Sequence, residues 1–377
     1  MWSANGFVNA ISGRGARGGW PVRVVLAGLV LSTTLTPTRA VVSYYLVTDV
    51  PAILGGADYT PAQIVRSDNG TYVLELAVGG GLAEFRAVHR RPDGKWMLAP
   101  AAAADIGGTF VEPRDVILFD GVSTFSPLFD GSASGVPDYA SIDAVLLDGA
   151  DPVLSFDVPV NLGGIEYGPS DLVRYSGGTF SPYWSAAAAG VPAFANLVGA
   201  DRDSGGALVV TFDVPANLGG IDYLPGQRVR WNGGTSFSVY FADPSWPLAA
   251  GLRGFSFVPA SGSVPDGSGA PGTMLTVNLA AGNLTLSWGA SCASGDNDYE
   301  VYQGTLGSPF NYNHNQKLCT TGGATTATFA APAGSTYFLV TPRNAIREGS
   351  YGRATGGAEL PQGSTACLPQ EIALSCP

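Results

Sequence analysis

The stretch Val158-Pro159-Val160-Asn161-Leu162-Gly163-Gly164-Ile165 recurs 56 residues later as Val214-Pro215-Ala216-Asn217-Leu218-Gly219-Gly220-Ile221. A Gly-Gly pair with a proline five residues after it occurs four times, at intervals of 52, 56 and 56 residues. The second glycines are Gly56, Gly108, Gly164 and Gly220, and the prolines are Pro61, Pro113, Pro169 and Pro225. A fixed period of this size is typical of solenoids and propellers. The sequence therefore predicts four copies of one supersecondary unit.

Each copy contains four short runs with strand character. In the third copy these runs are residues 142–147, 153–156, 171–175 and 179–184, separated by turns rich in glycine, serine and aspartate. Four short antiparallel strands joined by tight turns form one blade of a propeller. Pro182 falls in the last run, which fits an outermost strand because a missing N–H costs least at an open edge.

The order of the runs predicts how the repeats close. The chain begins the repeat at its second strand, near residues 44–47, and the missing first strand follows the last copy at 252–257. An aromatic residue three positions after a leucine or valine marks the first strands; these residues are Phe85, Tyr139, Phe194 and Phe255. We expect an all-β, closed four-bladed β-propeller over residues 41–260, whose permuted closing strand removes open sheet edges. An open array of four-stranded sheets is the alternative, and a β-sandwich pair would not explain the period.

This region resembles a known propeller family in its layout. Residues 142–144 and 171–175 are similar to the inner strand and the aromatic-rich third strand of hemopexin-type four-bladed propellers. The resemblance does not carry over that family's haem and metal ligands, because no matching histidine pair is present. Its end-to-end disulfide is also missing, because residues 41–260 contain no cysteine.

A second module follows a short linker. Residues 261–272 are rich in serine, glycine and proline, which predicts a flexible linker. Residues 273–377 alternate apolar and polar side chains over five to seven short runs, which predicts a small β-sandwich. The segments 298–307, 340–344 and 348–352 resemble the C-terminal fibronectin type III-like module of secreted bacterial proteins. That resemblance implies an appended extracellular module without a catalytic residue.

The first forty residues have the pattern of an export signal. Residues 1–40 contain arginines but no acidic residue, and the apolar run 24–31 is too short to span a membrane. Small residues at Thr38 and Ala40 predict cleavage after Ala40, and an uncleaved anchor is the alternative. We therefore expect a secreted or cell-surface protein with no transmembrane segment after cleavage.

Cysteine usage is consistent with export. All four cysteines, Cys292, Cys319, Cys367 and Cys376, lie in the last quarter of the chain. An even number of cysteines in an exported chain predicts disulfides, and four cysteines allow three connectivities. We expect Cys292–Cys319, where the resembled module pairs its cysteines, and Cys367–Cys376, which would tie down the tail. A zinc site is the rival, but the C-x2-C spacing is missing.

Composition excludes several classes of function. The net charge is −11 and the pI is about 4.5, which argues against nucleic acid and against an anionic membrane surface as partners. Hydrophobic residues make up 45% of the chain, which argues against a disordered protein. Only two histidines are present, which limits histidine-based catalysis.

Calcium is the one cofactor that the spacing allows. Asp201-x-Asp203-x-Gly205 is able to offer oxygen ligands to Ca²⁺, although Asp and Gly at this place also suit a hairpin turn. Asp296, Asp298 and Glu300 form another acidic cluster with the same two interpretations. Apart from Ca²⁺ we expect no cofactor.

Aromatic residues are the candidate binding residues. Tyr183 and Trp184 lie at the end of a predicted outer strand and recur with the repeat, which favours packing between blades. Trp246 breaks the repeat pattern just before the closing strand, and we expect it to be an exposed contact.

Catalytic arrangements are few. Asp115 and Asp171 occupy one repeat position, and a pair of carboxylates is the basis of a glycosidase, although such residues more often bond to turn backbone. His89 and Asp143 are predicted to occupy equivalent positions on neighbouring inner strands, which would allow a His–Asp contact near the channel.

These observations predict a monomeric, exported, non-catalytic binding or adhesion protein. The propeller would present a rigid surface to a polysaccharide or an extracellular protein, and the sandwich would act as a spacer or attachment module. The alternatives are a carboxylate-dependent enzyme acting on a glycan and a passive structural protein of the cell envelope. Fold alone does not choose among them.

Overall fold

All regular secondary structure in the described part of the chain is β-strand. The computed structural model describes residues 43–77, 84–106, 108–247, 249–267, 272–307, 311–354 and 357–373, which belong to one compact unit, Val41–Pro377. No α-helix occurs within these ranges, and no helix in them is long and apolar enough to cross a membrane. The all-β prediction is confirmed. The predicted export signal, residues 1–40, lies outside the described residues.

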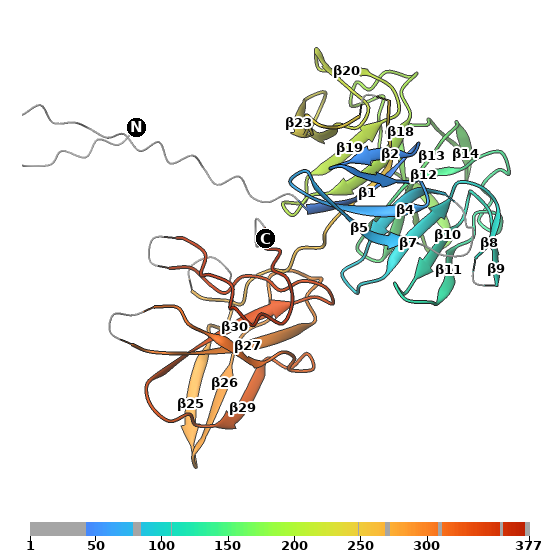
Figure 1. Cartoon of the computed structure of the whole chain (residues 1–377). Helices are drawn as coiled ribbons and strands as arrows, with labels where there is room; N and C mark the ends of the chain where they lie inside the picture. Colours follow the sequence, from blue (N-terminus) through green and yellow to red (C-terminus); the bar gives the residue numbers. More distant parts are fainter. Residues whose placement is uncertain are drawn as a thin grey trace, which may run out of the picture. The chain divides into compact units, whose positions relative to one another are not determined.

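Four four-stranded sheets account for the repeats (Figure 1). The first contains β24 (Leu252–Phe257), β1 (Ser43–Thr48), β4 (Gln63–Asp68) and β5 (Thr71–Ala77). The second contains β6 (Phe85–Arg90), β7 (Trp96–Pro100), β10 (Val116–Phe119) and β11 (Phe125–Phe129). The third contains β12 (Ile142–Asp148), β13 (Asp151–Phe156), β16 (Leu172–Ser176) and β17 (Thr179–Trp184). The fourth contains β18 (Leu197–Arg202), β19 (Leu208–Phe212), β22 (Arg228–Trp231) and β23 (Phe237–Phe241).

The end of the repeat region completes the sheet that its beginning starts. β24 pairs antiparallel with β1, and Phe255 lies opposite Leu46. The predicted pairing of 252–257 with the start of the chain is therefore confirmed. Every residue of β1 is buried, which explains why this edge does not stay open.

The aromatic residues that mark the predicted first strands do not occupy equivalent positions in the structure. Phe85 starts β6 opposite Pro100, whereas Ile142 holds the matching place in β12, opposite Phe156. Tyr139 and Phe194 precede their strands and are 64% and 71% exposed. The equivalence of Phe85, Tyr139 and Phe194 is therefore wrong, although the strand order inferred with it is right.

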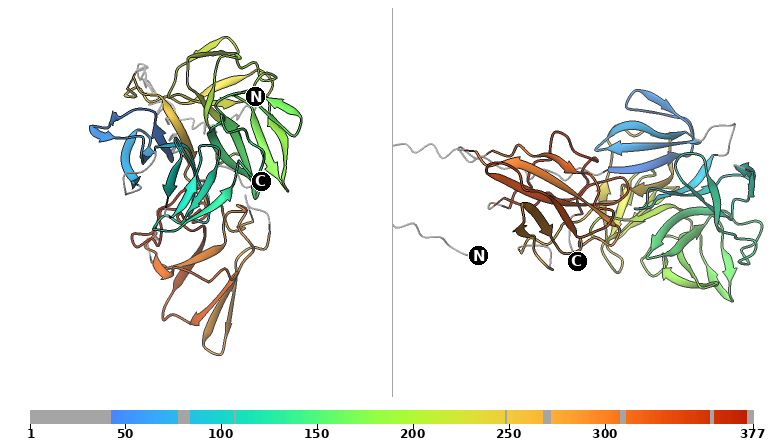
Figure 2. Two further views of the ribbon diagram at one scale, coloured as in Figure 1. Left: turned by 90° about the vertical axis from the view of Figure 1, so that its right-hand side faces the viewer. Right: turned by 90° about the horizontal axis from the view of Figure 1, so that it is seen from below.

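The first strands of the four sheets, β6, β12, β18 and β24, lie beside one another. β6 contacts β12 and β24, and β18 contacts the same two strands (Figure 2). Four apolar clusters each join two sheets. One of them joins Val209 of the fourth sheet to Leu46 and Phe255 of the first. Burial of these clusters is the main force that holds the sheets against one another.

The Gly-Gly motif makes a hairpin of its own in every repeat. The hairpins are β2 (Ala52–Leu54) with β3 (Ala57–Tyr59), β8 (Ala104–Ile106) with β9 (Thr109–Val111), β14 (Val160–Leu162) with β15 (Ile165–Tyr167), and β20 (Ala216–Leu218) with β21 (Ile221–Tyr223). Gly163 and Gly164 turn the third hairpin with φ angles of 62° and 86°. Two consecutive residues with positive φ are the requirement of the type I′ turn, which explains the Gly-Gly pair.

The C-terminal residues form two further sheets. One contains β25 (Thr276–Ala280), β26 (Asn283–Ser287) and β29 (Thr326–Ala330), and the other contains β28 (Asn315–Leu318), β27 (Asp298–Thr305) and β30 (Thr336–Arg343). Leu286 of the first sheet and Val301 of the second share one apolar cluster with Trp288. The two sheets thus bury apolar side chains in one shared cluster.

The start of the predicted linker, residues 261–272, is packed. Ser261 is fully buried, its N–H donates to the carbonyl of Glu371 at 2.8 Å, and its carbonyl accepts from the N–H of Ala373 at 2.9 Å. Val264 belongs to the apolar cluster of the C-terminal sheets. These residues are therefore fixed by the C-terminal module.

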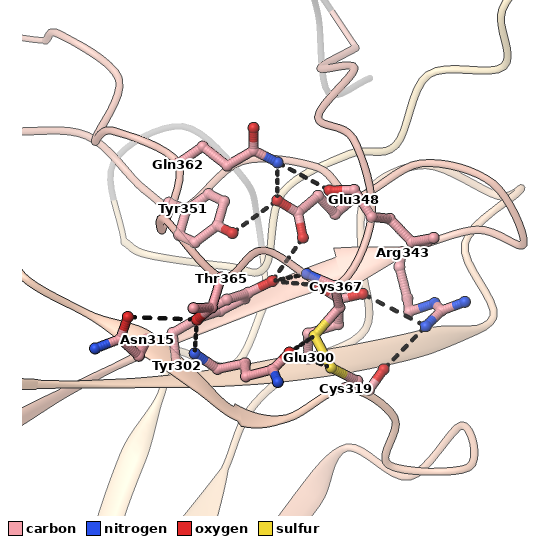
Figure 3. Close-up of a disulfide and its surroundings, with 12 residues drawn as sticks. Glu300, Tyr302, Asn315, Cys319, Arg343, Glu348, Tyr351, Gln362, Thr365 and Cys367 are labelled. Carbon is pink, nitrogen blue, oxygen red and sulfur yellow. Dashed lines mark hydrogen bonds and ion pairs between the residues drawn. A yellow bond between two sulfur atoms is a disulfide. The ribbon is translucent and has the colours of Figure 1, made fainter.

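The predicted cysteine pairing is wrong. Cys319 is bonded to Cys367, 48 residues later, with their Cα atoms 5.6 Å apart (Figure 3). The reason is the path of the tail, because the Cys367 N–H donates to the Tyr302 hydroxyl at 3.0 Å, which brings the tail against β27. Cys292 is also disulfide-bonded, and Cys376 lies outside the described residues.

Candidate functional site

A cleft of about 450 Å³ is lined by the outer strand of the third sheet, β17, and by residues of the fourth sheet. Its side-chain lining comes from the ends of β17, β18 and β22, from the start of β19 and from the turn after β22. The principal residues are Tyr183, Trp184, Arg202, Arg230, Trp231 and Asn232. This volume lies within the usual range of small-molecule sites in proteins.

Three aromatic rings form the apolar part of the cleft. The rings of Trp184 and Trp231 meet edge to face, with centroids 6.1 Å apart. The Trp231 indole N–H donates to the carbonyl of Gly234 at 2.8 Å, which fixes this ring. The buried indole nitrogen of Trp184 has no hydrogen-bond partner within the described part of the chain.

Arginine side chains form the polar part. The Nε of Arg202 donates to the Tyr183 hydroxyl at 2.7 Å, and the same guanidinium lies 5.3 Å from the centre of the Tyr183 ring. A further N–H of Arg202 donates to the carbonyl of Gly206. The Arg230 side chain is 43% exposed, and its Nε lies 3.7 Å from Asp203 Oδ2. Arg202 is thus held in place, whereas Arg230 remains accessible.

The repeat itself shows that this polar lining is particular to one pair of sheets. Pro127 and Pro182 hold the same register in β11 and β17, so the next residue is Leu128 in one sheet and Tyr183 in the other. In the same way, Leu147 of β12 holds the register position of Arg202 in β18. The preceding sheet pair therefore has leucines where the cleft has Tyr183 and Arg202.

Two of the three predicted binding residues, Tyr183 and Trp184, line this cleft, and the third does not. Trp246 is half-buried, and its indole N–H donates to the carbonyl of Ala250 at 2.6 Å. The indole lies on Gly226, where an added Cβ would be 2.5 Å from the Trp246 Nε1 atom. Trp246 is thus only partly exposed and packs against the cluster that joins the first and fourth sheets, and its role as a binding contact stays a prediction.

The two aspartates predicted to bind Ca²⁺ make separate sets of hydrogen bonds. Asp201 accepts from the Ser256 hydroxyl and from the Phe257 N–H, both at 2.8 Å. Asp203 accepts from the N–H groups of Gly205 and Ala207, at 3.0 and 2.9 Å. Among the described residues no group of three His, Cys, Asp or Glu side chains is placed to hold a metal ion. Calcium binding stays a prediction from spacing.

His89 contacts Asp201, not Asp143. Its Nδ1 lies 3.4 Å from Asp201 Oδ2 and 3.3 Å from Ser256 Oγ. His89 lies opposite Met97 and Asp201 opposite Val209, so these two residues share one register position. The predicted equivalence of His89 and Asp143 is wrong because Phe85 matches Ile142 and not Tyr139, so Asp143 holds the position of Arg86, at the bulge that both strands share.

Asp143 is a buried carboxylate of the repeat region with a raised pKa. It is 4% exposed, and burial raises its pKa to about 6 against the opposing effects of Arg86 and Asn196. Arg86 Nη1 lies 3.0 Å from Asp143 and 2.6 Å from Asp157. The Asn196 amide donates to Asp143 at 2.5 Å. These contacts join the second and third sheets to the loop that precedes β18 of the fourth sheet.

Asp115 and Asp171 hold turns. Asp171 accepts from the N–H groups of Gly168 and Ala186, each at 2.8 Å. Asp115 accepts from the N–H groups of Glu112 and Gly131 at 2.8 and 2.9 Å. The side-chain oxygens of Gln63 and Gln227, which stand at this position in the other repeats, also accept turn N–H groups. The backbone-bonding interpretation accounts for these four residues.

A buried acidic cluster lies near the disulfide, as Figure 3 shows. Glu300 and Glu348 are both fully buried. The Tyr302 hydroxyl lies between them, 2.8 Å from Glu300 Oε2 and 2.7 Å from Glu348 Oε2. Burial, followed by the contact with Glu348, raises the pKa of Glu300 to about 9. Sequence reasoning placed Glu300 in an acidic cluster but missed Glu348, which enters from a distant loop.

The other members predicted for that acidic cluster face elsewhere. Asp296 Oδ2 accepts from the Gly262 N–H at 2.8 Å and from the Ser291 hydroxyl at 2.5 Å. Asp298 Oδ1 accepts from the N–H groups of Thr321 and Gly323. Both carboxylates fix loops at the edge of the C-terminal sheets.

Comparisons with known proteins identify no family for this chain. No protein-family model and no curated protein matches the sequence. Among solved structures, the chain is similar to YCF48 bound to a D1 peptide, at 9% identity and a TM-score of 0.25 over 50% of this chain and 61% of that one. It is also similar to virginiamycin B lyase from Staphylococcus aureus, at 9% identity and a TM-score of 0.24 over 79% of this chain and 77% of the lyase.

A third similar structure is the extracellular domain of a protein described as a hybrid two-component system of B. thetaiotaomicron. The identity is 12% and the TM-score 0.24, over 80% of this chain and 42% of that one. The chain spans less than two thirds of the length of the YCF48 structure and of this extracellular domain.

Proposed function

We propose that residues 41–260 form a closed four-bladed β-propeller. Three observations support closure: the pairing of β24 with β1, the contacts of β6 and β18 with both β12 and β24, and the apolar cluster that joins the fourth sheet to the first. In a closed propeller every blade packs against two neighbours, so both faces of each four-stranded sheet are buried.

The C-terminal module is proposed to be a fibronectin III-like spacer or attachment module of an exported protein. Two three-stranded sheets around Trp288 support the first part of this proposal. The Cys319–Cys367 disulfide supports export, because disulfides persist in oxidising compartments.

The proposed activity is non-catalytic binding of a polysaccharide in the cleft beside β17 and β22. The observation that carries this proposal is the pair of partly exposed rings, Tyr183 and Trp231, beside arginine donors at one accessible concavity, with the buried Trp184 ring packed edge to face against Trp231. Aromatic rings offer a flat apolar surface to the C–H face of a sugar, while fixed N–H donors orient its hydroxyl groups. A rigid propeller suits this role because the cleft needs little reorganisation on binding.

Binding of residues 41–377 to an oligosaccharide array tests the proposal. Trp231→Ala should weaken the affinity for the bound oligosaccharides by about tenfold, since an aromatic contact of this kind contributes on the order of 1 kcal/mol. Phe194→Ala is the matched control, because that ring is 71% exposed and lies outside the cleft. An array without any bound oligosaccharide, or equal losses in both variants, would overturn the proposal.

A further inference from the structure

We infer that the ligand of this cleft is an acidic glycan, which carries a carboxylate or sulfate group on a sugar ring and is recognised by Arg230 and Arg202. The inference rests on the proposed function and specifies its ligand. Carboxylate is planar and sulfate is tetrahedral, but both are anions with several acceptor oxygens. A guanidinium binds either group through parallel N–H···O hydrogen bonds.

The charge of the cleft differs from the charge of the chain. The chain has a net charge of −11, but two guanidinium groups and no carboxylate line the cleft. The nearest carboxylate to Arg230 is that of Asp203, whose side chain is only 2% exposed and which already accepts two backbone N–H groups. An anion in the cleft would therefore meet positive charge in a protein that otherwise repels it.

The repeat supplies an internal comparison for Arg230. Arg66, Arg174 and Arg230 hold one register position, opposite Tyr45, Val153 and Val209. Arg66 donates to Asp68 and to Glu75, each at 3.1 Å, and Arg174 is paired with Asp148.

Arg230 differs from both of these arginines. Its closest carboxylate oxygen lies 3.7 Å away, beyond hydrogen-bond distance, and its side chain is more exposed than the other two. Two copies of this arginine are thus neutralised within the protein, and the copy in the cleft has room for an external anion.

Arg202 adds a second, oriented guanidinium. Its hydrogen bonds to the Tyr183 hydroxyl and to the Gly206 carbonyl hold it across the Tyr183 ring. Fixing a long side chain before the ligand arrives removes part of the entropy cost of binding. The cleft therefore combines one held cation, one accessible cation and an aromatic surface, which is the combination that an acidic sugar ring requires.

The test is calorimetric titration of residues 41–377 with two matched pairs of oligosaccharides. One pair is an oligouronate and the same oligosaccharide with its carboxyl groups reduced to alcohols. The other is a sulfated oligosaccharide and its desulfated form. We expect at least tenfold tighter binding of one acidic member than of its neutral counterpart, with an affinity that falls as salt is raised. The pair that shows the preference identifies the anion as carboxylate or sulfate.

Two variants assign the preference to the cleft. Arg230→Gln should remove the preference for the acidic member, and Arg66→Gln, at the same register position in the first sheet, should retain it. Equal binding of acidic and neutral members, still weakened by Trp231→Ala, would overturn the acidic ligand and leave polysaccharide binding in place. Absence of binding to all four oligosaccharides and to the whole array would overturn both.

Discussion

Replacing Glu300 with glutamine should make the C-terminal module less sensitive to alkaline pH. The Tyr302 hydroxyl has one proton but three close partners: Glu300 Oε2, Glu348 Oε2 and the Cys367 N–H, which donates to it. If the hydroxyl donates to Glu348, Glu300 must supply the proton for its own contact.

The surroundings of the two carboxyl groups assign that proton to Glu300. Glu348 Oε1 accepts from the Tyr351 hydroxyl at 2.7 Å and from the Gln362 amide at 2.5 Å, so Glu348 meets donors at both oxygens. Glu300 has Arg343 at 3.4 Å from its Oε1 and Tyr302 at its Oε2. The arrangement fits a protonated Glu300, which agrees with the raised pKa of this group.

The sign of the pH dependence follows from proton binding. The folded state keeps a proton on Glu300 up to a pKa of about 9, whereas the unfolded chain loses it near 4.5. The free energy of unfolding therefore falls as pH rises between these values, by at most about 1.4 kcal/mol per pH unit. From pH 6 to pH 8 the loss is at most roughly 3 kcal/mol.

Glutamine reproduces the protonated acid at every pH. Its amide group donates to Tyr302 and its carbonyl faces Arg343. Glu300→Gln should therefore remove the part of the pH-dependent decrease in the free energy of unfolding that comes from Glu300. Glu348→Gln is the matched control. The amide N–H groups of the new glutamine would face the donors that now bind Glu348, and this should lower the free energy of unfolding by about 2–4 kcal/mol.

Denaturant titrations of residues 41–377 at several pH values provide the measurement. Burial also raises the pKa of Asp143 to about 6 and of Glu371 to about 7, so the readout is the difference between wild type and each variant. Disulfide reduction identifies the transition of the C-terminal module. The reasoning is refuted if Glu300→Gln leaves the pH slope unchanged, or if it destabilises the protein more than Glu348→Gln does.

Two further predictions concern the fold. Removing the disulfide with Cys319→Ala and Cys367→Ala should lower the free energy of unfolding by about 4 kcal/mol, since the bond closes a span of 48 residues; an unchanged denaturation midpoint would contradict this. Phe255→Ala in β24 should cost about 3–5 kcal/mol, because the ring is 1% exposed between the first and last sheets, and a loss below about 1 kcal/mol would argue against packing at that junction.

The repeat, its strands and the strand that completes the first sheet could be predicted because they depend on local patterns. Gly163-Gly164 specifies a tight turn wherever it occurs, and alternation specifies a strand without reference to its neighbours. The first copy of the repeat lacks its first strand, and one extra strand follows the last copy. The order of the runs therefore predicts the pairing of β24 with β1.

Features that depend on register or on distant segments were not predictable in this way. Ile142 and not the exposed Tyr139 is the counterpart of Phe85, so Asp143 lies at the position of Arg86 and not of His89, and sequence spacing does not show this register. The cysteine pairing depends on where the tail crosses β27, which a hydrogen bond to Tyr302 determines. The cleft was found only in part, because Arg230 looks like Arg66 and Arg174 in the sequence and differs in its carboxylate partners.

The most direct measurement is the affinity of residues 41–377 for an acidic oligosaccharide before and after Arg230→Gln, with Arg66→Gln measured beside it. The account predicts at least a tenfold loss in Arg230→Gln and no change in Arg66→Gln. Equal affinities for wild type and Arg230→Gln would contradict it.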